Sequence, residues 1–89
     1  MSDVGPLVHI TSVRVLSRYL VALTFDNGAS RVIDLEPFLW GEMFKPMLDN
    51  YEFFLRVAID QDAGTISWPN GADLSPRTLY AESKPEVPA

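Results

Sequence analysis

The stretch Tyr19–Asp34 reads YLVALTFDNGASRVID and decides the fold. It consists of two alternating apolar runs separated by Asp26-Asn27-Gly28. Asn-Gly between two such runs is the strongest short-range signal of a β-hairpin, because a type I′ turn needs positive φ at both central residues. The sequence therefore predicts an antiparallel hairpin with Asn27-Gly28 as its two-residue loop.

This loop also predicts the pairing of the two strands. It places Leu23 opposite Val32 and Ala22 opposite Ile33. Since side chains alternate between the faces of a strand, a shift of one residue in the pairing would move all the apolar side chains of one face to the other. The residues predicted to face the core are Val21, Leu23, Phe25 and Val32.

The segments on either side of the hairpin complete the fold. Residues 9–16 read as a strand, and residues 35–54 read as short helices interrupted by Pro46. Residues 55–60 and 65–68 predict two more strands, and Ser75-Pro76 predicts the start of a last helix because Ser is a good N-cap and Pro suits the first helical position. The fold class predicted is α+β: a small two-layer domain, mainly an antiparallel sheet in β-β-β-α-β-β-α order, with short helices packed on one face.

The length of 89 residues allows one domain. We expect a flexible N-terminus over residues 1–7 and a single α+β domain over residues 8–81. The polar, proline-rich residues 82–89 are predicted to form a disordered C-terminal tail.

Few residues in the chain suggest catalysis. There is no cysteine, His9 is the single histidine, and no glycine-rich phosphate loop occurs. We therefore expect no catalytic, cofactor-binding or metal-binding residues, no cofactor, and no enzymatic activity.

The net charge of −5 disfavours direct binding to nucleic acid. No signal peptide and no apolar run of about 18 residues is visible, so we expect a cytoplasmic protein that does not enter the membrane.

Two groups of residues remain as candidate sites. Trp40, Met43, Phe44 and Met47 cluster around a glycine and a proline, and Trp and Met are favoured at protein interfaces. They form either part of the core or a surface for another small protein or a second copy. The second group is a pocket predicted from Asp34, Trp68, Asn70 and Asp73.

The stretch Trp68–Tyr80, WPNGADLSPRTLY, bears on the second group. Its residues are explained structurally as the end of a strand, a turn and a capped helix. The alternative is a loop that binds a small molecule.

This stretch, together with Phe25–Gly28 and Val32–Leu35, resembles the bacterial family known as domain of unknown function 2442. The resemblance covers roughly residues 8–81 and implies a small two-layer α+β domain. It implies no activity and no catalytic residue. The resemblance also implies that some members form the front half of longer chains that continue into a helix-turn-helix, and that many are encoded beside another small protein. Because this sequence ends at Ala89 without a DNA-reading domain, we expect any regulatory role to act through a partner.

These observations favour a protein-interaction or regulatory module that acts with a partner protein, in a two-protein system of toxin–antitoxin type. The alternative is a small-molecule-binding domain or weak enzyme with its site near Trp68–Asp73.

Overall fold

The computed structural model describes residues 8–86 of the chain. The predicted flexible N-terminus, residues 1–7, and the last three residues of the predicted tail lie outside the described residues. In chain order the elements are β1 (Ile10–Ser17), β2 (Leu20–Phe25), β3 (Ser30–Asp34), the 3-10 turn η1 (Glu36–Phe38), α1 (Lys45–Asp49), α2 (Tyr51–Phe54), β4 (Ala58–Asp60), β5 (Thr65–Ser67), α3 (Pro76–Glu82) and β6 (Lys84–Pro85).

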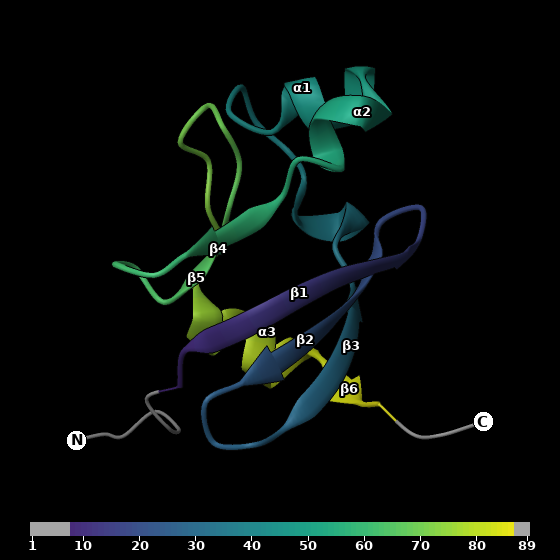
Figure 1. Ribbon diagram of the computed structural model, residues 1–89. Coiled ribbons are helices and arrows are strands. Elements are labelled where there is room, and N and C mark those ends of the chain that lie inside the picture. The colour runs from purple at the N-terminus through teal and green to yellow at the C-terminus, as the bar shows by residue number, and fades with distance from the viewer. Residues whose placement is uncertain (1–7, 87–89) are drawn as a thin grey trace.

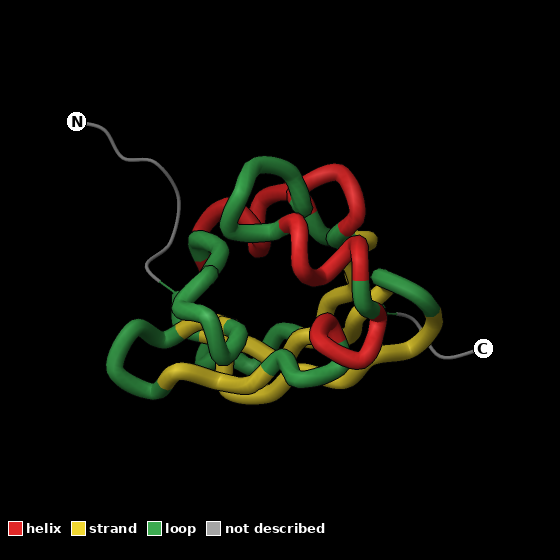
Figure 2. The backbone as a smooth tube through the Cα atoms, turned by 90° about the horizontal axis from the view of Figure 1, so that it is seen from above, coloured by secondary structure: helices red, strands yellow, loops and turns green. Residues whose placement is uncertain are grey.

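The strands form two antiparallel sheets, which confirms the predicted α+β class. The larger sheet has the order β1-β2-β3-β6, and β4 pairs with β5 in a smaller one. In Figure 1, α1 and α2 lie at one end of the molecule and α3 lies behind the larger sheet. Seen from above, the strands run along one side of the molecule and most of the helical turns lie on the other (Figure 2).

The β2–β3 hairpin forms as predicted, but its loop has three residues rather than two. The Phe25 amide donates to the carbonyl of Ala29 at 2.9 Å, and Gly28, at φ +89°, donates to the carbonyl of Phe25 at 3.0 Å. The Asn27 side chain accepts from the Ala29 amide at 3.0 Å. This is a type I turn followed by a left-handed glycine, a geometry that leaves Asn27 at negative φ.

The longer loop shifts the predicted register by one residue. Val21 lies opposite Ile33, and Leu23 lies opposite Arg31. The predicted core face is therefore correct on β2 and wrong on β3: Ile33 is buried, whereas Val32 is on the other face and half-buried.

A second turn repeats the geometry of the first. Trp68 and Ala72 are joined by the same hydrogen bond, at 2.9 Å, and Gly71 again has a φ of +89°. The Asn70 side chain accepts from the Ala72 amide at 3.1 Å, as Asn27 does from Ala29. The two turns share the pattern aromatic-x-Asn-Gly-Ala, in which Asn stabilises the turn and Gly takes the left-handed position.

The prediction of a disordered tail from residue 82 is wrong as far as residue 86. Glu82 is the last residue of α3, and β6 then pairs with β3, with Val32 opposite Lys84. The Glu86 amide donates to the carbonyl of Ser30 at 2.9 Å. The reason is that α3 returns the chain to the edge of β3, where unpaired backbone groups gain partners that the tail composition alone does not reveal.

The start of α3 confirms the sequence prediction. Ser75 is the N-cap, its hydroxyl accepts from the Thr78 amide at 3.3 Å, and Pro76 occupies the first helical turn. The cap directs the helix so that Leu79 is fully buried against the sheet.

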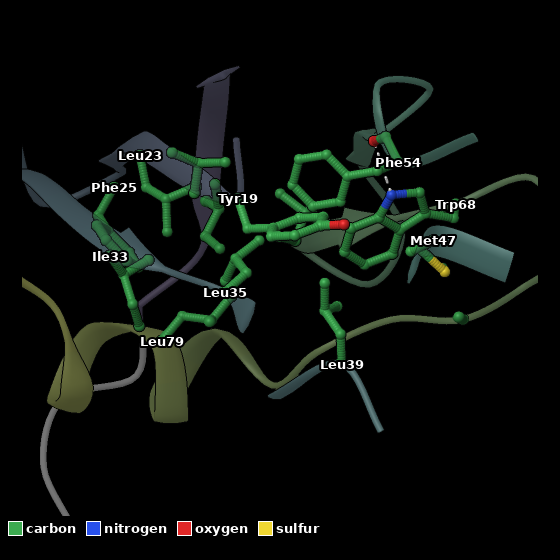
Figure 3. Packing of buried hydrophobic residues seen from close by; sticks show 14 of the residues in the cluster. Tyr19, Leu23, Phe25, Ile33, Leu35, Leu39, Met47, Phe54, Trp68 and Leu79 are labelled. Atoms are coloured by element: carbon green, nitrogen blue, oxygen red, sulfur yellow. Dashed lines mark hydrogen bonds between the residues drawn. The ribbon is translucent and has the colours of Figure 1, made fainter. Parts of the chain in front are cut away.

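The core runs without interruption from the larger sheet to the helical end. Figure 3 shows Leu23, Phe25, Ile33 and Leu79 on one side and Leu39, Met47, Phe54 and Trp68 on the other, with Tyr19 and Leu35 between them. Tyr19 meets Phe54 edge to face at 4.9 Å between ring centroids. The Trp68 indole Nε1 donates to the carbonyl of Phe54 at 3.0 Å. A single core therefore joins both sheets to the helices.

We expect Gly28→Ala to destabilise the domain by about 1–2 kcal/mol, the cost of a left-handed conformation for a residue with a Cβ. Nothing lies within 4 Å of the added Cβ, so the effect would come from φ alone. Urea unfolding measures it. Gly28→Asn is the matched control, because Asn tolerates this conformation better and should lose less. An alanine variant as stable as the wild type would contradict the turn geometry.

Candidate functional site

The large exposed apolar side chains of the described residues lie in two segments, 16–20 and 40–55. They are Leu16, Leu20, Trp40, Met43, Leu48, Tyr51 and Leu55, which we call the apolar end. The Tyr51 hydroxyl donates to the carbonyl of Arg18 at 2.6 Å, which holds the β1–β2 turn beside α2. Figure 1 shows this turn and the two helices at the same end of the molecule.

A hollow of 360 Å³ lies beside two of these residues, Trp40 and Met43. It is lined by Phe38, Trp40, Gly41, Glu42, Met43, Phe44 and Leu74, and we call it the Trp40 hollow. Glu42 supplies the single charged side chain of this lining. The Trp40 residue is 76% exposed, an unusual position for the largest apolar side chain.

The chain around Trp40 is held by specific contacts. Gly41, at φ +88°, turns the backbone between η1 and α1. The Asn70 amide nitrogen donates to the carbonyl of Met43 at 2.9 Å, so the second Asn-Gly turn supports this loop. The Trp40 hollow is therefore built on a fixed backbone.

The predicted partner surface is divided by the structure. Trp40 and Met43 are exposed, and Phe44 is half-buried with its ring edge to face on Trp68 at 6.0 Å. Met47 is fully buried. Its assignment to a partner surface is wrong, because it lies on the inner side of α1 and packs in the main core.

The residues of the predicted pocket each have a structural contact. Trp68 is buried, and the Asn70 side chain hydrogen-bonds to the Ala72 amide of its own turn and to the Met43 carbonyl. Asp73 is exposed, and its backbone forms an isolated β-bridge with Ser67. Asp34 accepts from the Glu36 amide at 3.0 Å and lines a hollow of 410 Å³. Trp68, Asn70 and Asp73 do not line that hollow, so the structure does not bring the four residues together there.

Another hollow, of 550 Å³, lies toward the opposite end of the larger sheet. Its lining is His9, Ile10, Thr11, Asp26, Ile59, Gln61, Asp62 and Gly64. His9 Nδ1 lies 3.1 Å from one Asp26 carboxylate oxygen, and the His9 amide donates to the other at 3.2 Å. The ring lies against Gly64, where a Cβ would come within 2.2 Å of it. Sequence reasoning missed this pair because its members are 17 positions apart.

The pair is a carboxylate and an imidazole in contact, beside a hydroxyl that is already hydrogen-bonded. The hydrogen bond from the His9 amide, and then that from its side chain, lowers the pKa of Asp26. An ionised Asp26 would orient the imidazole, as an acid does in a catalytic triad. However, the one hydroxyl in the lining, that of Thr11, donates to the carbonyl of Thr24. Within residues 8–86, no group of three metal-ligating side chains comes together.

The fold and these sites together define a small α+β domain whose most distinctive surface is an exposed tryptophan beside an apolar hollow. The family described as "Protein of unknown function (DUF2442)" matches residues 10–85, nearly the whole chain. The chain belongs to this family. No curated protein and no solved structure gives a significant match. Within the part of the chain that the structure describes, none of the helices is long and apolar enough to cross a membrane.

We expect Met47→Ala to cost about 2–5 kcal/mol of stability, because it removes a fully buried side chain and leaves a cavity. Met43→Ala is the matched control: Met43 is exposed, so its truncation should change stability by no more than about 0.5 kcal/mol. Thermal or urea unfolding of both variants measures the difference. Equal losses would contradict the assignment of Met47 to the core and Met43 to the surface.

The lowered pKa of Asp26 predicts a dependence of stability on pH. The folded-state value lies below the ordinary value of 3.8, so the contacts with His9 stabilise the fold above that pH. Their contribution disappears as the pH falls through the folded-state pKa. Titration of the Asp26 carboxyl carbon by NMR should give a midpoint below 3.8.

The variant His9→Ala tests the cause of this shift. It removes the ring contact and keeps the amide hydrogen bond, so the midpoint should return only part of the way to the ordinary value. A wild-type midpoint at or above 3.8 would contradict the geometry of the pair.

Proposed function

We propose that this domain is a protein-interaction or regulatory module that acts with a partner protein, in a two-protein system of toxin–antitoxin type. The observation that carries the proposal is Trp40, which is 76% exposed at the edge of an apolar hollow. Tryptophan is enriched among the few residues that supply most of the binding energy at protein interfaces.

The surroundings of Trp40 support this role. Met43 lies exposed beside it, and Met is a flexible apolar side chain that adapts to a partner surface. Single exposed apolar residues are normal on a protein surface, whereas a cluster around a concavity marks an interaction site. The apolar lining of the Trp40 hollow forms such a cluster, and the contact from Asn70 to the Met43 carbonyl holds the loop in place before any partner arrives. A preorganised surface loses less entropy on binding.

The proposal extends to the expected properties of the protein. We propose a bacterial, cytoplasmic protein without catalysis of its own, which neither binds nucleic acid directly nor enters the membrane. The net charge of −5 supports the absence of direct nucleic-acid binding, because phosphate backbones repel an acidic surface. The absence of catalysis is supported by Thr11, whose hydroxyl is the one in the lining of the 550 Å³ hollow and already donates to the carbonyl of Thr24.

The alternative function, small-molecule binding near Trp68–Asp73, gains no support from the geometry. Trp68 is buried, and the Asn70 side chain is engaged on both its oxygen and its nitrogen. Asp34 accepts a hydrogen bond from the chain at the start of η1. These side chains serve the fold, so we propose the interaction module alone.

The proposal is tested by retrieving the tagged protein from its native host and identifying stoichiometric companions by mass spectrometry. We expect one small protein to co-elute with the wild type and to be lost with Trp40→Ala. Removal of an exposed side chain should change stability by no more than about 0.5 kcal/mol, so the loss would report on binding rather than folding.

Leu16→Ala is the matched control. It truncates another exposed apolar residue, which does not line the Trp40 hollow. Sedimentation of the purified protein distinguishes a second copy from a different partner. A companion retained in full by Trp40→Ala would contradict the assignment of the surface.

A further inference from the structure

Acidic side chains outnumber basic ones in the segment that contains Trp40. Residues 34–55 contain five acidic side chains and a single basic one, Lys45. This segment thus carries four of the five net negative charges of the chain. It also contains most of the residues of the apolar end, including Trp40 and Met43. The segment that contains Trp40 is therefore rich in both apolar and acidic residues.

Few of these acids are neutralised within the domain. Lys45 pairs with Asp49 at 3.1 Å, and Arg18 lies 3.9 Å from Glu36. Among the described residues, Glu42 and Glu52 have no ion-pair partner. Glu42 lines the Trp40 hollow itself. A carboxylate at the rim of an apolar site favours a ligand that brings a positive charge next to an apolar group.

We infer that the partner docks on the Trp40 hollow with a basic, apolar segment: an apolar side chain that enters the hollow, flanked by Lys or Arg. This inference rests on the proposed function and names the chemistry of its partner. The flanking cation meets Glu42 and the exposed face of the Trp40 ring, since tryptophan is the best aromatic partner for a cation. Arg31 already lies over the Tyr80 ring in this way, at 4.8 Å from its centroid.

The same charges disfavour a second copy as the occupant. In a two-fold symmetric dimer, the same patch would face itself, so the acidic side chains of one copy would approach those of the other. Like charges placed opposite each other across an interface oppose association. The same negative charge attracts a basic partner and repels a second copy.

Two synthetic amphipathic peptides of equal length test the inference, one built from Leu and Lys and the other from the same Leu positions with Glu. Binding is followed through acrylamide quenching of tryptophan fluorescence, because Trp40 is exposed and Trp68, the other tryptophan, is 3% exposed. We expect the Lys peptide to bind at least about tenfold more tightly than the Glu peptide, a difference that weakens as salt is added.

Three variants assign the effect to the site. Glu42→Gln should weaken binding of the Lys peptide several-fold. The matched control Asp62→Asn removes one charge at the 550 Å³ hollow beside His9 and should leave binding unchanged. In the wild type, peptide binding should protect the Trp40 fluorescence from acrylamide. In Trp40→Phe this protection should be absent. Sedimentation of the free protein across concentrations should show no dimer formed through this face.

The outcomes separate the inference from the proposed function. Equal binding of the two peptides, no binding of either, or insensitivity to Glu42→Gln would overturn the basic-segment inference. If a native companion is nevertheless lost with Trp40→Ala, the proposed function stands with a partner of other chemistry. If that companion binds Trp40→Ala as well as the wild type, the proposed function fails too.

Discussion

The rest of the structure depends on the contact between Trp68 and Phe54. The indole nitrogen donates to the Phe54 carbonyl at 3.0 Å, and both rings are buried where the helical segment meets the sheets. A buried indole N–H without an acceptor would be costly, so this bond selects one position for α2 relative to β5. Tyr19 extends the contact to the β1–β2 turn, since its ring meets Phe54 edge to face.

This contact explains how such short helices persist. α1 has five residues and α2 has four, far below the length at which an isolated helix is stable in water. Each is held instead by one fully buried side chain, Met47 in α1 and Phe54 in α2. Helices this short have little inner surface, and the apolar residues that do not fit beneath them remain exposed. The exposed surface around Trp40 thus follows from how few apolar side chains such short helices can bury.

The candidate site shows where sequence reasoning stops. The composition around Trp40, where Trp and Met stand together near Gly41, left both a core and an interaction surface open. Spacing could not separate Met43, which is exposed in the turn before α1, from Met47, which α1 places in the core, because burial depends on where the rest of the chain packs. The sequence did not reveal the pair of His9 and Asp26 for a similar reason: only the pairing of β1 with β2 brings these residues, 17 positions apart, into contact.

The sequence by itself determined the local elements: the hairpin after β2, the two Asn-Gly turns, the Ser75 cap and the α+β class. Each depends on the φ preferences and hydrogen bonds of a few adjacent residues, which are properties of the chain alone. The three-residue loop is local as well, since its hydrogen bonds lie within residues 25–29. Tertiary structure decided the addition of β6 to the sheet and the exposure of Trp40. These depend on backbone groups and side chains distant in sequence, because a strand edge or a buried face exists only once another part of the chain has reached it.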